Sequence, residues 1–336
     1  MAETQALKVD QEMYDITIVG GGPAGLFTAF YAGIRDAKTK IIDSLPQLGG
    51  QLAELYPEKY IYDVAGFPKV LARDLVNNLK EQAFQYSPTV CLNEKVIGLN
   101  KLEDGTFELT TNNTKHYSKT VIITAGIGAF TPRELPAENA SDFRDKGIHY
   151  FIDNLQAHQG KKALVVGGGD SAVDYALMLE TVCEKVTLIH RRDQFRAHEE
   201  SVKNLQKSSV EVKVFAELKA VHGEGKVEKA LLVNNKDKST EEIDVDLIIG
   251  ALGFSASLGP VHEWGLEIEN NAIVINTKCE TNIPGVYAAG DVVTYPGKVK
   301  LIATGFGEAP TAVNNAKLFY DPNSKLHPGH SSSRDH

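Results

Sequence analysis

Residues 15–25 read DITIVGGGPAG, an apolar run followed by the pattern Gly-x-Gly-x-x-Gly. The run predicts a buried strand, and the apolar segment 26–32 predicts a helix. A second apolar run, 39–42, ends at Asp43. This βαβ pattern is typical of a dinucleotide site, where glycines admit a pyrophosphate to the helix N-terminus and the acid accepts a ribose hydroxyl. A tight turn without a ligand is the alternative.

The glycine pattern occurs a second time. Residues 162–172 read KALVVGGGDSA, and a predicted helix and strand follow. Twenty-three residues after Gly167, the position that Asp43 occupies in the first unit holds His190, followed by three arginines: Arg191, Arg192 and Arg196. Arginines form charge-assisted hydrogen bonds with a 2′-phosphate, which favours NADP(H) at this second site and an ordinary ribose at the first. A solvated basic loop is the alternative.

Two stretches rich in glycine and other small residues, 124–130 and 250–256, bracket the second glycine unit. They predict an α/β fold of two dinucleotide-binding, Rossmann-like, three-layer domains, with the second domain inserted into the first. The predicted boundaries are 1–124 and 254–320 for the first domain, 125–253 for the second and 321–336 for a C-terminal extension. On composition alone this extension would be disordered.

Further elements are predicted outside the two glycine units. A strand at 285–289 leads to Gly290 and Asp291, and the segment 307–316 predicts a helix with Pro310 in its first turn. Small antiparallel sheets are predicted in two regions, 95–117 and 210–246.

Composition and charge narrow the class of partner. Over 336 residues, 35 Lys and Arg stand against 44 Asp and Glu, a net charge of −9, which argues against nucleic acid. Residues 16–34 carry no charge, but the glycines and Pro23 interrupt them, so a buried strand, turn and helix is favoured over a membrane span. The first fourteen residues lack the apolar core of a secretory signal.

The three cysteines, Cys91, Cys183 and Cys279, lie far apart in the sequence. Their spacing indicates neither a metal site nor a dithiol, and it suits a reducing, cytoplasmic compartment. The sequence contains no Gly-x-Ser-x-Gly, His-Glu-x-x-His or P-loop motif, so hydrolase and NTPase functions have no support.

Taken together, the motifs resemble the low-molecular-weight thioredoxin reductases over nearly the whole chain. The resemblance rests on both glycine patterns, on LGGQ at 48–51, on HRRDQFRA at 190–197 and on AGD at 289–291. It implies FAD in the first domain, with Asp291 at the ribityl-phosphate region, and NADPH in the inserted domain. The Cys-x-x-Cys of those enzymes is absent, because the corresponding region around 150–153 reads YFID.

A more specific resemblance is to the bacterial thioredoxin-reductase-like ferredoxin–NADP(+) reductases. It rests on LPQLGGQL at 45–52, LYPEKY at 55–60, DVAGFP at 63–68 and GFGEAPTAVNNA at 305–316, with a C-terminal extension that carries an aromatic ring. It implies that Tyr56 stacks on one face of the isoalloxazine and His330 on the other, in some members from the second subunit of a homodimer. An ordinary half-buried tyrosine and a ring in a floppy tail are the alternatives.

The resemblance and the motifs together yield a set of expected site residues. For FAD they are Gly20, Gly22, Pro23, Ala24, Gly25, Asp43, Gly50, Gln51, Tyr56, Val96, Ala125, Phe130, Gly290, Asp291, Ala309, Pro310, Thr311 and Ser332. For NADPH they are Gly167, Gly169, Asp170, Ser171, Ala172, His190, Arg191, Arg192 and Arg196. The helix that is predicted to begin near Pro310 is expected to direct its positive end at the flavin.

The expected function is that of an FAD-dependent oxidoreductase, a ferredoxin–NADP(+) reductase that uses ferredoxin or flavodoxin as its transient partner. Hydride passes between NADP(H) and FAD, and single electrons pass to or from an iron–sulfur protein, so no acid–base side chain is required. Two alternatives stay open: an NADPH-dependent disulfide or quinone reductase, and a redox-sensing flavoprotein without turnover. An acidic ferredoxin needs a local basic patch, for which Lys59, Lys298 and Lys300 are the candidates.

Overall fold

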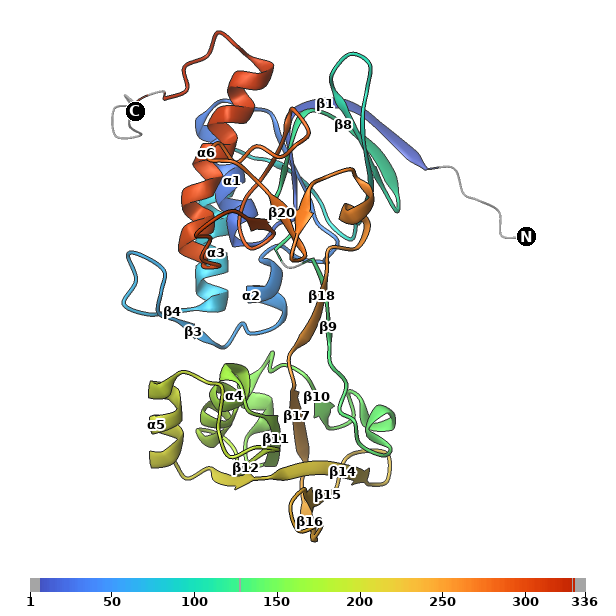
Figure 1. The fold of residues 1–336 in the computed structure, drawn as a ribbon, viewed down its shortest axis with the longest axis vertical. Helices are drawn as coiled ribbons and strands as arrows, with labels where there is room; N and C mark the ends of the chain where they lie inside the picture. The colour runs from blue at the N-terminus through green and yellow to red at the C-terminus, as the bar shows by residue number, and fades with distance from the viewer. Residues whose placement is uncertain (1–6, 127, 328, 330–336) are drawn as a thin grey trace, which may run out of the picture. The chain divides into compact units, whose positions relative to one another are not determined.

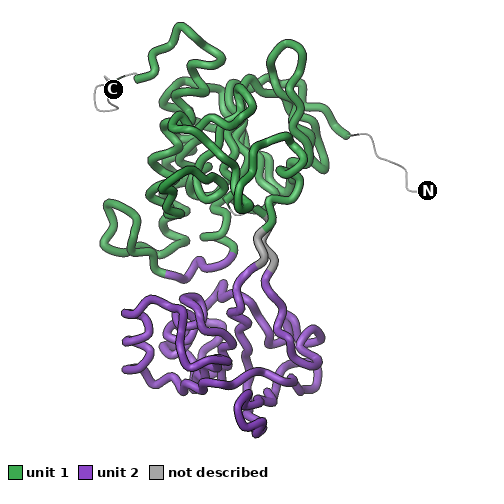
Figure 2. Tube along the Cα trace, in the orientation of Figure 1, with its two compact units in different colours: residues 1–54, 60–129, 256–336 green, residues 55–59, 130–255 purple. Residues whose placement is uncertain are grey.

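The computed structural model describes residues 7–126, 128–327 and 329, and it describes 129–131 and 255–256 by their backbone alone. The chain forms two compact units. Unit 1 comprises residues 1–54, 60–129 and 256–336, and unit 2 comprises 55–59 and 130–255 (Figure 2). Unit 2 is therefore inserted into unit 1, and a five-residue segment from the first part of the chain also groups with it.

Unit 1 is built on a seven-stranded sheet with the order β5-β2-β1-β8-β7-β6, in which β21 also pairs with β8. Its strands are β1 (Lys8–Val19), β2 (Thr39–Ile42), β5 (Thr89–Cys91), β6 (Val96–Lys101), β7 (Phe107–Thr111), β8 (Thr114–Ile123) and β21 (Val286–Ala288). Strands β5, β2, β1, β8 and β21 are parallel, whereas β6, β7 and β8 form an antiparallel meander. This meander is the small sheet predicted within 95–117.

The apolar runs of the sequence form the buried strands of this sheet. Ile16, Ile18, Ile41 and Ile122 have no exposed surface, as expected for parallel strands that are covered on both faces. Three helices, α1 (Pro23–Ile34), α3 (Ala72–Phe84) and α6 (Ile302–Tyr320), lie together on one side of the sheet (Figure 1). The shorter elements of unit 1 are α2 (Gly50–Glu54), β3 (Tyr60–Ile61), β4 (Val70–Leu71), β19 (Ile268–Glu269), β20 (Ala272–Val274), β22 (Val293–Thr294) and the 3₁₀ turn at Gly259–Glu263.

The helix α6 differs from its prediction. It begins at Ile302, so Pro310 lies in its interior and not in its first turn. The buried stripe of this helix starts at Gly305 and continues through Glu308, Ala309, Ala312, Val313 and Ala316 at helical spacing. Packing of this stripe outweighs the one hydrogen bond that proline cannot donate, and the expectation that the helix N-terminus lies at Pro310 is wrong.

Unit 2 contains a five-stranded parallel sheet with the order β10-β17-β11-β12-β13. Its strands are β10 (Ile148–His149), β11 (Lys162–Gly167), β12 (Lys185–His190), β13 (Glu211–Val214) and β17 (Leu247–Ala251), and its helices are α4 (Asp170–Glu180) and α5 (Glu199–Lys207). A three-stranded antiparallel sheet follows, made of β14 (Ala216–His222), β15 (Lys229–Asn234) and β16 (Thr240–Asp244), as predicted within 210–246. The 3₁₀ turns are Ala140–Phe143 and Leu155–His158.

Besides the segment 55–59, the chain passes from one unit to the other within two strands, β9 (Ala129–Pro132) and β18 (Phe254–Ser257). These strands pair with each other, and the N–H of Arg133 donates to the carbonyl of Gly253 at 3.0 Å. The glycine-containing stretches of the sequence thus become a two-stranded ladder and not two independent loops.

Candidate dinucleotide-binding sites

The first glycine turn lies between β1 and the N-terminus of α1. Gly20 has φ +107°, and a Cβ atom there would lie 2.7 Å from the carbonyl oxygen of Thr124. A Cβ atom on Gly25 would lie 2.0 Å from the carbonyl oxygen of Gly20. Gly22 caps α1 without a side-chain hydrogen bond, and Pro23 follows it. No side chain caps this helix N-terminus, an arrangement suited to a bound pyrophosphate.

Asp43 lies beside this turn at the end of β2. Its side chain accepts hydrogen bonds from the N–H groups of Gly21 at 2.5 Å and Leu45 at 2.8 Å. Burial raises the pKa of Asp43 above its usual value, although both hydrogen bonds act in the opposite direction. Each carboxylate oxygen keeps a further lone pair, so the group can accept the hydroxyls of a ribose.

Several other predicted FAD residues gather around the same turn. The Cα of Gly22 lies 3.0 Å from where a Cβ on Gly50 would be, and the N–H of Gly49 donates to the carbonyl of Gly21 at 2.9 Å. The Cα of Ala125 lies 2.8 Å from a Cβ placed on Gly20, and Gln51 approaches Gly126. Val96 is buried at the start of β6. Phe130 lies on β9, where only the backbone is described.

The turn at Gly290 and Asp291 packs between α1 and α6. A Cβ on Gly290 would lie 3.1 Å from the Cβ of Ala24, and one on Gly305 would lie 3.2 Å from the Cα of Gly290. Burial raises the pKa of Asp291, while Lys298 and Lys300 oppose this shift. The predicted residues Ala309, Pro310 and Thr311 lie in the third turn of α6 and not at its N-terminus.

A residue that was not predicted, Glu308, holds this turn in place. Its carboxylate accepts the N–H of Gly290 at 2.7 Å and the hydroxyl of Tyr295 at 2.7 Å, and it forms an ion pair with Lys298. The side chain of Lys298 is 4% exposed, so its prediction as a docking cation is wrong. Glu308 could have been recognised from the sequence as the one acidic residue among the small and apolar residues on the buried face of α6.

Tyr56 lies in the segment 55–59, which groups with unit 2, and it is half-buried. The hydroxyl of Tyr175 on α4 donates to the carbonyl of Leu55 at 3.1 Å. Lys59 pairs with Asp174 at 2.5 Å, and its Nζ lies 6.0 Å from the centroid of the Tyr56 ring. The other predicted stacking residue, His330, and also Ser332, lie outside the described residues.

The second glycine turn joins β11 to α4 within unit 2. A Cβ on Gly167 would lie 2.3 Å from the carbonyl oxygen of Ala251, and Gly169 caps α4 without a side-chain hydrogen bond. Asp170, Ser171 and Ala172 form the first turn of α4. This turn therefore repeats the close backbone approach of the first one.

The loop after β12 folds back onto this second turn. The N–H of Arg196 donates to the carbonyl of Gly168 at 2.7 Å, and the N–H of His198 donates to Asp170 at 2.8 Å. His190 Nε2 lies 3.1 Å from the carbonyl oxygen of Gln194, and its ring stacks on Phe195. Burial is the main cause that lowers the pKa of His190, and the neighbouring arginines act in the same direction.

The three arginines of this loop are exposed. None of their guanidinium groups forms an ion pair with a residue in the part of the chain that the structure describes. The loop also lines a hollow of about 830 Å³ with α5 and β13, whose walls include Phe195, Leu205 and Val212. Unpaired guanidinium groups beside a glycine turn can bind a phosphate without first breaking an existing ion pair.

All three cysteines are free. Burial raises the pKa of Cys279 to about 12, and the nearby Glu308 adds to this shift. A thiol of this kind remains protonated at neutral pH and is a poor nucleophile.

Each unit thus presents a glycine turn between a parallel strand and a helix N-terminus, which defines a protein with two dinucleotide-binding folds. The chain belongs to the pyridine nucleotide-disulphide oxidoreductase family, whose model matches residues 14–316. The fold class predicted from the sequence is confirmed.

Two sequence relatives cover almost the whole chain. A ferredoxin–NADP reductase of Geobacillus kaustophilus is 60% identical over 98% of this chain and 99% of its own length. A ferredoxin–NADP reductase of Halalkalibacterium halodurans is 61% identical over 96% of this chain and 98% of its own length.

Solved structures agree with the fold. Thioredoxin reductase of T. acidophilum has a TM-score of 0.79 at 25% identity and covers 94% of this chain and 100% of its own. Thioredoxin reductase of Lactococcus lactis has a TM-score of 0.77 at 25% identity and covers 91% of this chain and 98% of its own. None of the helices in the described part of the chain combines the length and apolarity needed to cross a membrane.

Proposed function

We propose that this protein is an FAD-dependent ferredoxin–NADP(+) reductase. The observation that carries the proposal is the roughly 60% identity, over nearly the full chain, with proteins of that name. Three separate, free cysteines in place of a dithiol support the same function over disulfide reduction. When bound, FAD supplies hydride exchange with NADP(H) and single-electron exchange with an iron–sulfur protein.

In this proposal, unit 1 holds FAD. The uncapped N-terminus of α1 at Gly22 binds the pyrophosphate, and Asp43 accepts hydrogen bonds from the ribose. The turn at Asp291 lies at the ribityl-phosphate region, and Glu308 fixes this turn by accepting the N–H of Gly290. The remaining FAD residues of the sequence-based set, with Tyr56 and His330 as the two stacking rings, belong to the same proposal.

Unit 2 holds NADP(H) in this proposal. The N-terminus of α4 receives the pyrophosphate, and Arg191, Arg192 and Arg196 bind the 2′-phosphate. Burial and the neighbouring arginines lower the pKa of His190, which favours its neutral form beside the phosphate site. Selectivity for NADP(H) over NAD(H) then comes from the arginines.

The finer parts of the proposal concern partners and organisation. Ferredoxin or flavodoxin is the transient partner, the protein acts as a cytoplasmic homodimer, and the FAD, NADP(H) and tail regions follow the boundaries predicted from the sequence. Of the proposed docking lysines, Lys300 is exposed, whereas Lys59 is engaged by Asp174. Lys300 is therefore the one kept as a docking candidate.

The test is reduction of purified acceptors by the FAD-loaded protein with NADPH. Ferredoxin and flavodoxin are compared with thioredoxin at equal concentrations, and electron flow is followed by coupled cytochrome c reduction or by thiol release. Reduction of ferredoxin or flavodoxin with inert thioredoxin supports the proposal. Efficient thioredoxin reduction, or a flavin that NADPH fails to reduce rapidly in a stopped-flow experiment, would overturn it in favour of one of the two alternatives.

A further inference from the structure

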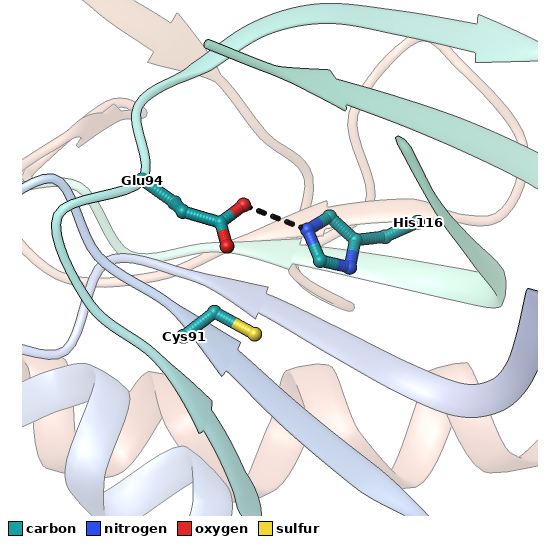
Figure 3. Close-up of side chains that lie close together, drawn as sticks. All are labelled: Cys91, Glu94 and His116. Carbon is teal, nitrogen blue, oxygen red and sulfur yellow. Dashed lines mark hydrogen bonds and ion pairs between the residues drawn. The ribbon is translucent and has the colours of Figure 1, made fainter. Parts of the chain in front are cut away.

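A cysteine, a glutamate and a histidine from separate parts of the sequence meet in unit 1. Cys91 ends β5, Glu94 lies in the turn before β6, and His116 lies on β8. One ligand atom from each side chain lies within 4.8 Å of the others, and the three side chains point toward one another (Figure 3). The spacing of the cysteines did not predict this cluster, because its members come together in the folded structure and not in a sequence motif.

The side chains around this cluster already orient its members. His116 is 2% exposed, and its Nε2 lies 2.9 Å from Glu94 Oε2. The same carboxylate oxygen accepts the hydroxyl of Thr111 at 2.7 Å. On the other side of the ring, Nδ1 lies 3.6 Å from Asp10 Oδ2. A carboxylate behind a histidine ring is the usual outer partner of a metal-bound imidazole.

Lys40 completes the surroundings and limits what the cluster can bind. Its side chain is fully buried, pairs with Asp10 at 2.5 Å and lies 3.0 Å from His116 Nδ1. The formal charges of Asp10, Glu94 and Lys40 sum to −1 − 1 + 1 = −1. A divalent cation that displaces the thiol proton of Cys91 to solvent adds +2 − 1 and brings the sum to zero. An anion at this position would only add to the buried negative charge.

We propose that Cys91, Glu94 and His116 form a binding site for Zn²⁺. Sulfur, imidazole nitrogen and carboxylate oxygen are all zinc ligands, and three protein ligands leave a fourth position for water. Bond lengths of about 2.0 to 2.3 Å place ligand atoms of one zinc ion roughly 3.3 to 3.8 Å apart, so the three atoms, which lie within 4.8 Å of one another, would draw closer when the metal binds. In the structure Lys40 Nζ donates to Nδ1 of His116. Zinc binding at Nε2 would place the ring proton on Nδ1, so Lys40 would turn from the ring toward Asp10, and Asp10, now 3.6 Å from Nδ1, would move closer to accept that proton.

The site would act on the loop that carries Asp43. The N–H of Asp43 donates to the carbonyl of Cys91 at 2.9 Å, and the N–H of Glu94 donates to the carbonyl of Asp43 at 3.0 Å. A cation that ties Cys91 and Glu94 to β8 would therefore fix the backbone on which Asp43 depends. Zn²⁺ at this site would act by holding the backbone around Asp43, and the inference stands whether or not the proposed reductase function is correct.

The first experiment measures Zn²⁺ binding to the full-length, FAD-loaded protein after chelator treatment, in competition with a chromophoric chelator. The wild type is expected to bind one Zn²⁺ per chain, and Cys91→Ser and His116→Gln are expected to lose this binding. Asp10→Asn should weaken it about 10- to 100-fold, because the outer partner of the histidine is lost. Cys183→Ser is the matched control, since Cys183 is the other half-buried cysteine and should leave binding unchanged.

A second measurement, the alkylation rate of Cys91, uses the wild type and so does not depend on a variant that folds. Zn²⁺ should slow the alkylation of Cys91 in the wild type, measured by peptide mass spectrometry, and leave the rate at Cys183 unchanged. Co²⁺ should produce visible absorption, beyond the flavin bands, that disappears with Cys91→Ser. If Cys91 reacts equally fast with and without Zn²⁺, or if the wild type takes no Zn²⁺ from the chelator, the cluster is a hydrogen-bonded ion network and the proposal is wrong.

Discussion

Lys298 and Glu308 form an ion pair in which the two side chains are 4% and 8% exposed. The pair joins the loop after Gly290 to the middle of α6, and Glu308 also accepts the N–H of Gly290. Burying an ion pair costs desolvation free energy, so the pair need not add to the stability of the fold. Because Glu308 also accepts the N–H of Gly290, we infer that the pair fixes the position of the Gly290–Asp291 turn.

Glu308→Gln should destabilise unit 1. Glutamine can still accept the N–H of Gly290, but Lys298 is left as a buried, unpaired cation, which typically costs about 3 to 5 kcal/mol. Urea unfolding at a fixed FAD concentration measures the loss. Replacing both partners in Glu308→Gln/Lys298→Met should recover most of it. If the single variant is as stable as the wild type, the pair contributes nothing and the role assigned to Glu308 is wrong.

Asp43 should make FAD retention sensitive to acid. Burial raises the pKa of this carboxyl, whereas a ribose hydroxyl that donates to it favours the charged form. As the pH falls through this raised pKa, Asp43 takes up a proton and loses acceptor capacity, so affinity for FAD should fall at a higher pH than an ordinary aspartate would titrate. Fluorescence of released FAD measures this. Asp43→Asn should bind FAD more weakly at neutral pH and show a flatter acid profile, and an unchanged profile would remove Asp43 from the site.

The arginine loop of unit 2 should determine cofactor choice. Each charge-assisted hydrogen bond to a phosphate contributes about 1.5 to 3 kcal/mol, so the wild type should prefer NADPH to NADH at least tenfold in kcat/KM. Arg191→Ala with Arg192→Ala should reduce kcat/KM for NADPH far more than for NADH. Arg73→Ala, an exposed arginine on α3 of unit 1, is the control. Equal kcat/KM for both cofactors in the wild type would disprove the assignment of this loop.

The hydroxyl of Tyr175 should hold the Tyr56 segment on unit 2. It donates to the buried carbonyl of Leu55, and an unsatisfied buried carbonyl costs roughly 1 to 3 kcal/mol. In Tyr175→Phe, hydrogen–deuterium exchange should therefore rise within 55–60, while the sheet of unit 2 keeps its protection. Tyr320→Phe is a matched control, because within the described residues the buried Tyr320 hydroxyl has no hydrogen-bond partner. Equal exchange in both variants would show that Tyr175 does not hold the segment.

Two truncations of the C-terminal tail separate the role of His330 from that of the contacts between Arg35 and the tail. The guanidinium of Arg35 donates to the carbonyls of Lys325 at 2.7 Å and Leu326 at 3.2 Å. Truncation after His327 keeps these contacts and removes His330, so it should leave FAD bound but change the flavin absorbance and the rate of reduction by NADPH. Truncation after Asp321 removes the Arg35 contacts as well and should also lower thermal stability. If the protein truncated after His327 has the flavin absorbance and the reduction rate of the wild type, His330 does not cover the flavin.

Local patterns in the sequence were enough to predict the fold class. The apolar runs ending at Gly20 and Gly167 predicted two buried strands, since a strand covered on both faces must be apolar throughout. The glycines themselves were predictable, because a side chain at Gly25 would collide with the backbone of the same turn. The contrast between Asp43 and His190 likewise follows from counting along the chain, because each residue lies at the end of the strand next to its turn.

Tertiary structure decided the features that depend on residues distant in the chain. The buried stripe of α6, which packs in unit 1, sets the start of the helix at Ile302 despite Pro310. Lysine is normally a surface residue, and the burial of Lys298 is explained only by its ion pair with Glu308. Cys91, Glu94 and His116 meet even though β2 and β1 lie between β5 and β8 in the sheet, so only the three-dimensional course of the strands and of the turn before β6 brings their side chains together. Periodicity reports which face of an element is buried, but partners across a sheet or between helices depend on strand order and packing, which no local pattern contains.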